Sequence, residues 1–220
     1  MALKILGAVN QPANGLFGLC FTSDCDKKGI ITFRGTVGLG GWIDNYKGAF
    51  TADTPQQINA LAFLKNMQTQ FGFTQFDLAG HSKGGNNAQY ITILCGDFIE
   101  QCISFNSPGF SADFLHKYKD SIKQNREKIT AYECSYDIVN ILLNSIAGRR
   151  VVIEAGTKAP KANHKPNHIL DYTGSIGRLG IRNPIYITVQ NMTIGLSFAI
   201  ANAKKRIRTK KTKKNKTDIT

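Results

Sequence analysis

The sequence predicts an α/β fold with a mostly parallel central sheet and helices on both faces. Short apolar runs alternate with helical stretches along most of the chain, as in parallel strands joined by crossover helices. The chemically interesting polar residues follow directly after apolar runs, and the active sites of such sheets lie where the carboxyl ends of the strands meet. A chain of 220 residues with 42% hydrophobic content can bury one sizeable core.

The positive charge is concentrated at the C-terminal end. The formal net charge is +13. Residues 204–220 hold nine Lys or Arg and one Asp, a net +8, which leaves +5 for residues 1–203. We therefore predict a folded domain over residues 1–203 and a lysine-rich, disordered tail over residues 204–220.

Cysteine usage indicates a reducing compartment. The five cysteines are an odd number without a C-x-x-C pair, which argues against a zinc site and against a disulfide scaffold. Residues 1–9 are apolar but too short for a signal peptide. We expect a cytoplasmic protein, peripheral at a membrane if its tail binds one, without a metal or other cofactor.

The first part of the chain predicts two strands and a helix. Leu16–Phe21 and Gly29–Phe33 are apolar runs separated by a polar turn. The glycine-rich segment 38–42 is expected to be a loop. A capping box at Thr54–Gln57, with proline at the first helical position, starts a helix that ends near Gly72.

A G-x-S-x-G turn at residues 80–84 is the feature around which the chain is organised. It follows an apolar strand at Phe76–Ala79 and precedes a helix from Gly85 to about Leu94, which is the pattern of a nucleophile elbow. Ser82 would sit at its apex in a strained conformation, with glycines where side chains would collide with the neighbouring strand and helix. The alternative is a serine that only caps a helix.

The next elements continue the alternation. A strand is expected at Cys102–Phe105 and a charged helical stretch at residues 111–128. Ile129–Cys134 is the next strand, a helix follows from Ile138 to Ile146, and Arg150–Glu154 is the last clear strand.

A nucleophilic serine needs a base and an acid that orients it. In α/β-hydrolases these follow in the chain order serine, acid, histidine. Of four histidines, His168 best fits the base, and His164 is the alternative. Asp137 ends a strand between serine and base, which makes it the candidate acid. Both histidines are alternatively solvated loop residues, and Asp137 a turn former or helix cap.

Two donors are expected for a negatively charged oxygen at the serine. One is the backbone N–H of Lys83. The other is Thr36, through its N–H and its hydroxyl, since Gly35 allows the chain to approach closely. The alternative for residues 34–36 is an ordinary strand-ending turn.

Several motifs together resemble the class 3 lipases. They are Phe33-Arg34-Gly35-Thr36, Trp42, Gly80-His81-Ser82-Lys83-Gly84-Gly85-Asn86, Phe105-Asn106-Ser107-Pro108-Gly109, Asp137-Ile138-Val139, and His168 with Tyr172. The glycine-rich form is similar to an uncharacterised bacterial and phage branch of lipase-like α/β-hydrolases. The resemblance covers roughly residues 15–175.

The resemblance implies an α/β-hydrolase fold and a lipase- or phospholipase-like enzyme that cleaves lipid acyl esters through an acyl-enzyme. It implies Ser82, Asp137 and His168 as the triad, and Thr36 and Lys83 as oxyanion donors. Lys83 stands where lipases commonly carry an aliphatic residue, which hints at an anionic substrate. A small lid would fall at Phe110–Lys128.

The C-terminal region allows several interpretations. Pro184–Ala203 is apolar but interrupted by polar amides, which favours a packing helix or strand pair over a membrane span. The basic tail would bind an anionic membrane surface, bind nucleic acid, or only solubilise the protein. No aromatic residues interleave with the lysines, which disfavours nucleic acid. The alternatives to an enzyme are a non-catalytic binding protein on a hydrolase fold and a nucleic-acid-associated protein.

Overall fold

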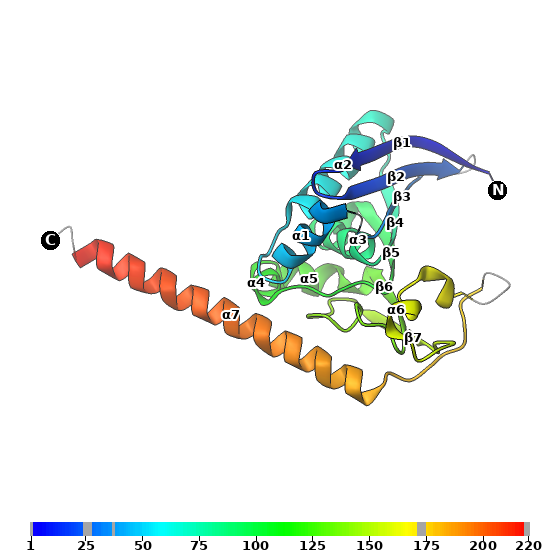
Figure 1. The fold of residues 1–220 in the computed structure, drawn as a ribbon. Coiled ribbons are helices and arrows are strands. Elements are labelled where there is room, and N and C mark those ends of the chain that lie inside the picture. The colour runs from blue at the N-terminus through cyan, green and yellow to red at the C-terminus, as the bar shows by residue number, and fades with distance from the viewer. Residues whose placement is uncertain (1, 24–27, 37, 171–174, 218–220) are drawn as a thin grey trace.

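The computed structural model describes residues 2–23, 28–36, 38–170 and 175–217. Its described part forms a seven-stranded sheet whose strands lie side by side in chain order (Figure 1). Strands β1 to β3 are antiparallel, and β3 to β7 are parallel. The strands are β1 (Leu3–Gln11), β2 (Leu16–Ser23), β3 (Lys28–Phe33), β4 (Gln75–His81), β5 (Ile99–Phe105), β6 (Ile129–Cys134) and β7 (Arg149–Ile153).

The helices are distributed unequally over the two faces. They are α1 (Gly38–Gly48), α2 (Pro55–Phe71), α3 (Lys83–Leu94), α4 (Ala112–Lys117), α5 (Lys119–Asn125), α6 (Pro160–Asn163) and α7 (Pro184–Thr217), with short 3-10 turns η1 (Gly96–Phe98), η2 (Arg126–Lys128) and η3 (Pro166–His168). Helices α1 to α5 lie on one side of the sheet (Figure 1). Parallel strands added in one direction by right-handed crossovers place every crossover on that side. The mostly parallel sheet is confirmed.

The opposite face has a smaller apolar cover. Over β6 and β7, Ile169 from the chain after β7 packs with Cys134 and Ile153, and all three are buried. Phe105 and Tyr132 stack beside them, with ring centroids 5.7 Å apart. The segment that follows the last strand is thereby fixed against the sheet near the carboxyl ends of its strands.

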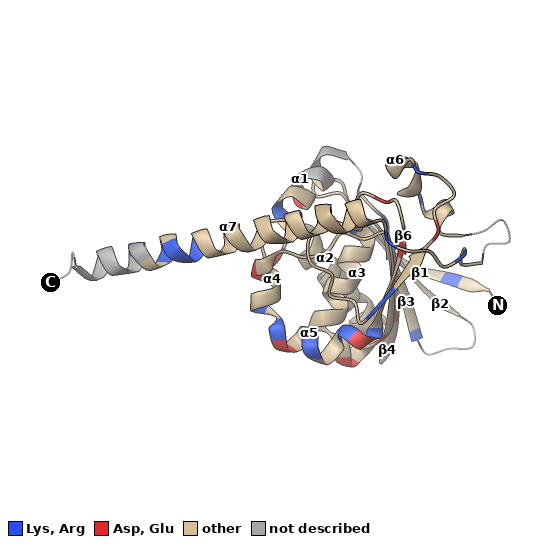
Figure 2. Ribbon diagram, turned by 90° about the horizontal axis from the view of Figure 1, so that it is seen from below, with Lys and Arg blue, Asp and Glu red and all other residues tan. Residues whose placement is uncertain are grey.

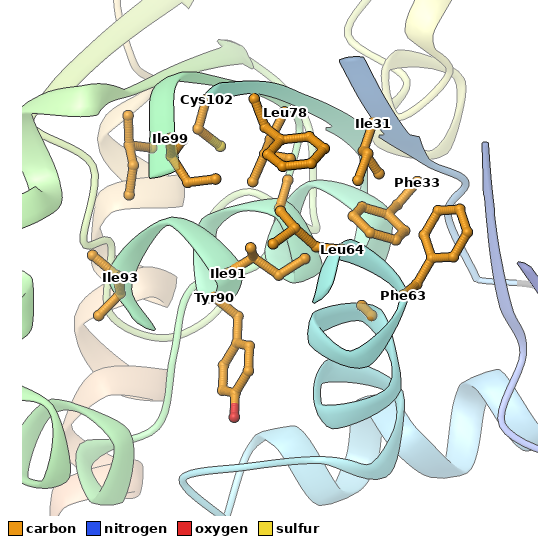
Figure 3. Close-up of a cluster of buried hydrophobic side chains, with 14 of the residues drawn as sticks. Ile31, Phe33, Phe63, Leu64, Leu78, Tyr90, Ile91, Ile93, Ile99 and Cys102 are labelled. Atoms are coloured by element: carbon orange, nitrogen blue, oxygen red, sulfur yellow. The ribbon is translucent and has the colours of Figure 1, made fainter. Parts of the chain in front are cut away.

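The main core lies between the sheet and helices α2 and α3 (Figure 3). Ile31, Leu78 and Cys102 come from three neighbouring strands and meet Leu64 of α2 and Ile91 of α3, all of them almost completely buried. Fully burying an aliphatic side chain of this size contributes about 1.5–3 kcal/mol. This core holds the start of α3 against the ends of β3 and β4, where the candidate site lies.

Helix α2 begins and ends as its sequence predicts. The Thr54 hydroxyl accepts from the N–H of Gln57, and the Gln57 side chain accepts from the N–H of Thr54, which completes the capping box. Gly72 ends the helix in the left-handed conformation at φ 68°. The sequence is sufficient to predict both ends of this helix, because each of these bonds joins residues only a few positions apart.

The glycine-rich segment at residues 38–42 is part of helix α1, not the expected loop. Its glycines serve close packing: a Cβ at Gly40 would lie 2.3 Å from the carbonyl oxygen of Ala13. Contacts distant in sequence therefore override the low helix propensity of glycine. Strand β1, which is not predicted from the sequence, pairs with β2 in antiparallel register.

The helix expected from Ile138 to Ile146 is wrong. This segment forms turns. The Asp137 carboxylate accepts from the N–H groups of Val139 and Asn140, and Leu143 has a φ of 66°. The positive φ of Leu143 and the backbone bonds between Asn144 and Phe110 are incompatible with a continuing helix.

Helix α7 continues without a break through the boundary expected at residue 203 and reaches Thr217 (Figure 1). The structure thus shows helix where the sequence predicts a disordered tail, because lysine and arginine are good helix formers once a helix has started. The helix packs against α4, and residues 184–209 are long and apolar enough to span a membrane by length and composition.

Candidate active site

Ser82 occupies a strained turn between β4 and α3. Its φ of 56° and ψ of −129° lie in a region of backbone conformation that residues other than glycine rarely adopt. Its N–H donates to the carbonyl of Phe105 at 2.8 Å, which fixes the turn to the end of β5. The geometry agrees with the elbow expected from the G-x-S-x-G pattern.

The glycines around Ser82 are required by space. A Cβ at Gly80 would lie 2.4 Å from the carbonyl carbon of Gly84, and one at Gly84 would lie 2.1 Å from the carbonyl oxygen of Phe33. A Cβ at Gly85 would lie 1.9 Å from Oγ of Ser107. The first turn of α3 therefore lies directly against the ends of the strands, as the sequence predicts.

Ser82, His164 and Asp137 form one chain of hydrogen bonds. His164 Nε2 lies 2.9 Å from Ser82 Oγ, and His164 Nδ1 lies 2.7 Å from Asp137 Oδ2. Asp137 is completely buried, and its other oxygen accepts from the N–H groups of Val139 and Asn140 at 2.7 and 2.8 Å. The carboxylate is thus held in the orientation that the imidazole requires.

The structure brings His164, not His168, to the serine, so the sequence-based preference for His168 is corrected. His168 lies in η3, and its carbonyl accepts from the Cys134 thiol at 3.6 Å. His164 follows α6, whose last residue, Asn163, accepts through its carbonyl from the Asn106 side chain at 3.0 Å. This long-range bond fixes the residue before His164 next to the end of β5. Chain order alone could not show which of the two histidines lies near Ser82.

Asn106 is a structural residue of the site that sequence reasoning did not assign. It is completely buried at a φ of 46°. Its Oδ1 accepts from the N–H of Cys134 and from the Asn140 side chain, while its Nδ2 holds Asn163. It therefore joins the ends of β5 and β6 to the two loops that carry Asp137 and His164. In the sequence, the feature that could have indicated this role is the position of Asn106 directly after a predicted strand.

His81 also contacts His164. Its Nε2 lies 2.6 Å from the carbonyl oxygen of His164, and the two rings lie 4.8 Å apart. A carbonyl only accepts, so the Nε2–H of His81 donates. Burial lowers the pKa of His81, and this effect exceeds the opposite effect of its hydrogen bond to the His164 carbonyl. A neutral imidazole with its proton on Nε2 suits this contact.

Thr36 lies beside the serine. A Cβ at Gly35 would be only 3.1 Å from Cβ of Ser82, so the loop after β3 approaches the elbow closely. The hydroxyl oxygen of Thr36 accepts from Asn45 Nδ2 at 2.7 Å, which leaves its own proton available for another acceptor. Lys83 is the first residue of α3, and its N–H is among those that a helix leaves unbonded. Both expected oxyanion donors are thus next to Ser82.

The Lys83 side chain forms an internal ion pair. Its ammonium lies 3.0 Å from Asp44 Oδ2 and 3.2 Å from Asn86 Oδ1, and the Lys83 and Asp44 side chains are 3% and 2% exposed. Asp44 Oδ1 also accepts from the N–H of Gln56. The pair ties α1 to α2 and α3, and α1 carries the Asn45 that holds Thr36. The charge is therefore satisfied within the protein, contrary to the hint of an anionic substrate.

A cavity of about 690 Å³ opens beside Ser82, a size typical of small-molecule sites. Ser82, His164 and Thr36 line it together with a mainly apolar wall, formed by Ala49, Phe50, Phe110, Ile138, Val139, Leu142, Leu143 and Leu196. The segment expected as a lid, Phe110–Lys128, forms α4, α5 and η2, and its start is anchored in the core through Phe110 and Phe114, which are 2% and 0% exposed. Among the described residues no group of three or more His, Cys, Asp or Glu is placed to hold a metal.

The parallel sheet and the serine turn define an α/β-hydrolase fold of the lipase class. The Mbeg1-like family model matches residues 9–169, and the chain belongs to this class 3 lipase-like family. No curated protein matches the chain. Two residues of the motifs that resemble class 3 lipases are not fully described by the structure: Trp42, whose side chain is not described, and Tyr172, which lies outside the described residues.

Solved structures of fungal lipases are similar in fold. The match to the Lip2 lipase of Yarrowia lipolytica has a TM-score of 0.51 at 16% identity and covers 81% of this chain and 82% of that lipase. A Rhizomucor miehei lipase, in a propeptide complex, matches with a TM-score of 0.49 at 15% identity and covers 81% and 71%. At these identities the Yarrowia match establishes the fold alone.

The buried ion pair predicts a specific pattern of stability. Replacing Lys83 by Met leaves the Asp44 carboxylate buried without its partner, which should lower the free energy of unfolding by about 3–5 kcal/mol. The double variant Lys83→Met, Asp44→Asn carries no unpaired charge and keeps the acceptor for Gln56, so it should recover most of the loss. Urea unfolding measures both. A single variant as stable as the wild type would contradict the buried pair.

The lowered pKa of His81 predicts a dependence of stability on pH. As the pH falls below about 6.5, the unfolded chain takes up a proton at this residue before the folded protein does, so the free energy of unfolding falls. His81→Gln should therefore lose less stability than the wild type between pH 7.5 and pH 5.5. Urea unfolding at both pH values measures this, and His81→Phe serves as a second proton-free variant. Equal losses in all three proteins would contradict the assignment.

Proposed function

We propose that this protein is a serine hydrolase that cleaves carboxylic esters of lipids through an acyl-enzyme. The hydrogen-bond chain Ser82–His164–Asp137 carries the proposal. A serine hydroxyl becomes a competent nucleophile when an oriented imidazole accepts its proton. The lipase-class fold and the apolar cavity beside the serine support the same chemistry.

In the proposed mechanism, Ser82 Oγ attacks the ester carbonyl carbon while His164 Nε2 takes the hydroxyl proton. Asp137 stabilises the imidazolium that forms. The carbonyl oxygen becomes an oxyanion, which accepts hydrogen bonds from the N–H of Lys83 and from Thr36. His164 then returns its proton to the leaving alcohol. Water, deprotonated by His164, attacks the acyl-enzyme and releases the acid and the free serine.

The cavity favours an acyl chain as the group bound next to the serine. Its wall is predominantly aliphatic and aromatic, and burying a methylene contributes about 0.8 kcal/mol. Arg34 and Lys161 also line it, so phospholipids belong in the substrate panel beside neutral acyl esters. Comparing p-nitrophenyl esters of increasing chain length would measure the depth of this subsite.

Substitutions of the two histidines distinguish the proposed base from its neighbour. Ser82→Ala and His164→Ala should each lower kcat on p-nitrophenyl esters by roughly 10³ to 10⁶-fold, because serine and base act as a unit. His168→Ala is the matched control and should keep nearly wild-type activity. Ser82→Ala should also abolish labelling by a fluorophosphonate probe. Wild-type protein that is folded but neither labelled nor active would indicate a non-catalytic binding protein.

The Thr36 hydroxyl has its own test. Thr36→Val removes the hydroxyl but keeps the shape and the backbone N–H. Losing one oxyanion donor should lower kcat by about 10²–10³-fold with little change in KM. Thr36→Ser restores the hydroxyl and should recover most of the activity. A loss of the same size in both variants would assign the effect to the methyl group or to packing, not to oxyanion binding.

A further inference from the structure

Helix α7 turns its polar side chains toward the protein. Gln190 and Ser197 are 8% and 4% exposed. Ser197 Oγ accepts from the N–H of Ala112 at 2.9 Å, and Thr193 Oγ1 accepts from the N–H of Leu143 at 3.0 Å. Residues 190, 193 and 197 recur at helical spacing, so they form one face. This polar face is the one bonded to the rest of the molecule.

The outward face of α7 is mainly apolar before residue 204, with Thr188, Asn191 and Asn202 as its exposed polar residues. Its large exposed hydrophobic side chains are Ile185 (70%), Ile187 (43%), Val189 (37%), Met192 (68%), Leu196 (60%) and Ile207 (57%). A helix on a water-soluble protein normally has the opposite arrangement. Apolar side chains facing outward with polar ones bonded inward suit a nonpolar surrounding.

The charge beyond this apolar face indicates which surface would cover it. Lys205 and Arg206 are exposed and directly follow the apolar part, within a C-terminal segment that carries nine basic residues and one acid. Figure 2 shows the first half of α7 without charged residues and the basic residues farther along it. A membrane with anionic headgroups over a hydrocarbon interior matches both parts, since each basic residue near such a surface contributes about 1 kcal/mol.

The apolar surface is continuous with the cavity beside Ser82. Leu196 lines the cavity and is 60% exposed. Ile138 and Leu142 also line it and are 45% and 38% exposed. The mouth of the cavity is therefore rimmed by exposed aliphatic groups that belong partly to α7. A surface that covers α7 would also lie next to this mouth.

The contacts of α7 favour an orientation in the plane of the membrane over one across it. Besides the bonds at Thr193 and Ser197, Lys204 forms an ion pair with Asp113 at 2.9 Å. These contacts hold the middle of the helix along the protein body. A spanning orientation would break them and separate the helix from the cavity.

We propose that α7 docks on an anionic membrane, lying in its interface with the apolar face in the acyl region and the basic C-terminal part on the headgroups. The docking stands independently of the proposed function. Its consequence rests on that function: the cavity mouth meets the membrane, so the acyl chain of a lipid ester reaches Ser82 without crossing water. The substrate class is thereby narrowed to esters of membrane lipids.

Vesicle flotation with the full chain tests the docking. Ser82→Ala protein, which cannot hydrolyse the lipid, should float with phosphatidylcholine vesicles that contain phosphatidylserine, and much less with phosphatidylcholine alone. In this background, Ile185→Ser with Met192→Ser should reduce the bound fraction tenfold or more. Lys205→Glu with Arg206→Glu should do the same. Added salt should weaken binding.

Matched controls separate docking from general surface effects. Ile58→Ser removes a 51% exposed isoleucine of α2. Lys119→Glu with Lys123→Glu reverses two exposed charges on α5. Both controls should float like the parent protein. In the Ser82-containing protein, the α7 variants should keep wild-type activity on a soluble ester and lose it on vesicles, so failure of docking and failure of catalysis give different results.

Four outcomes would overturn the proposal. The first is absence of flotation, and the second is flotation that the α7 variants do not change. The third is a dimer that Ile185→Ser with Met192→Ser dissociates, which would assign the apolar face to a second copy of the chain. The fourth is resistance of membrane-bound protein to alkaline carbonate extraction, which would indicate a spanning helix.

Discussion

The close approach of helix α3 to the ends of β3 and β4 is the constraint on which the site depends. The first turn of α3 lies so near the strand ends that Gly84 has no space for a Cβ against the carbonyl of Phe33. The chain must reverse between strand and helix within one residue, which forces Ser82 to a φ of 56°. The same approach brings Thr36 and the N–H of Lys83 beside the serine. The core of β3, β4, α2 and α3 supplies the burial that offsets this strain.

Two buried polar networks extend this constraint to the rest of the site. Asn106 connects the ends of two strands to the loops of Asp137 and His164. The Lys83–Asp44 pair connects the elbow to α1 and, through Asn45, to Thr36. Breaking one of these bonds would leave a buried polar group without its partner, which is costly. The proposed base, acid and donors are therefore placed by bonds with few alternative arrangements.

The parts that the sequence predicts correctly are those with short-range causes. The elbow glycines and the capping box of α2 act over four or five residues, so spacing reveals them. His164 was only the alternative base, because its position follows from Asn106 holding α6 from 57 residues away. Helix α1 and the role of Lys83 were missed for the same reason: each depends on partners that only the folded chain brings together. From the sequence alone, the charge of Lys83 hints at an anionic substrate. In the structure this charge is paired with buried Asp44 instead.

Helix α7 shows the same limit in another form. Composition describes it as an apolar stretch followed by lysines, which fits a packing helix, a span or a tail equally well. The burial of each side chain distinguishes these three interpretations. Gln190 and Ser197 are buried against the protein, whereas Ile185, Met192 and Leu196 are exposed. Neither of its two parts would suffice for stable docking, since apolar burial competes with the cost of immobilisation and headgroup attraction is screened by salt. In the proposed docking, their succession along one helix lets both act at once, and Leu196, which lines the cavity and is also exposed, brings the cavity mouth to the same surface.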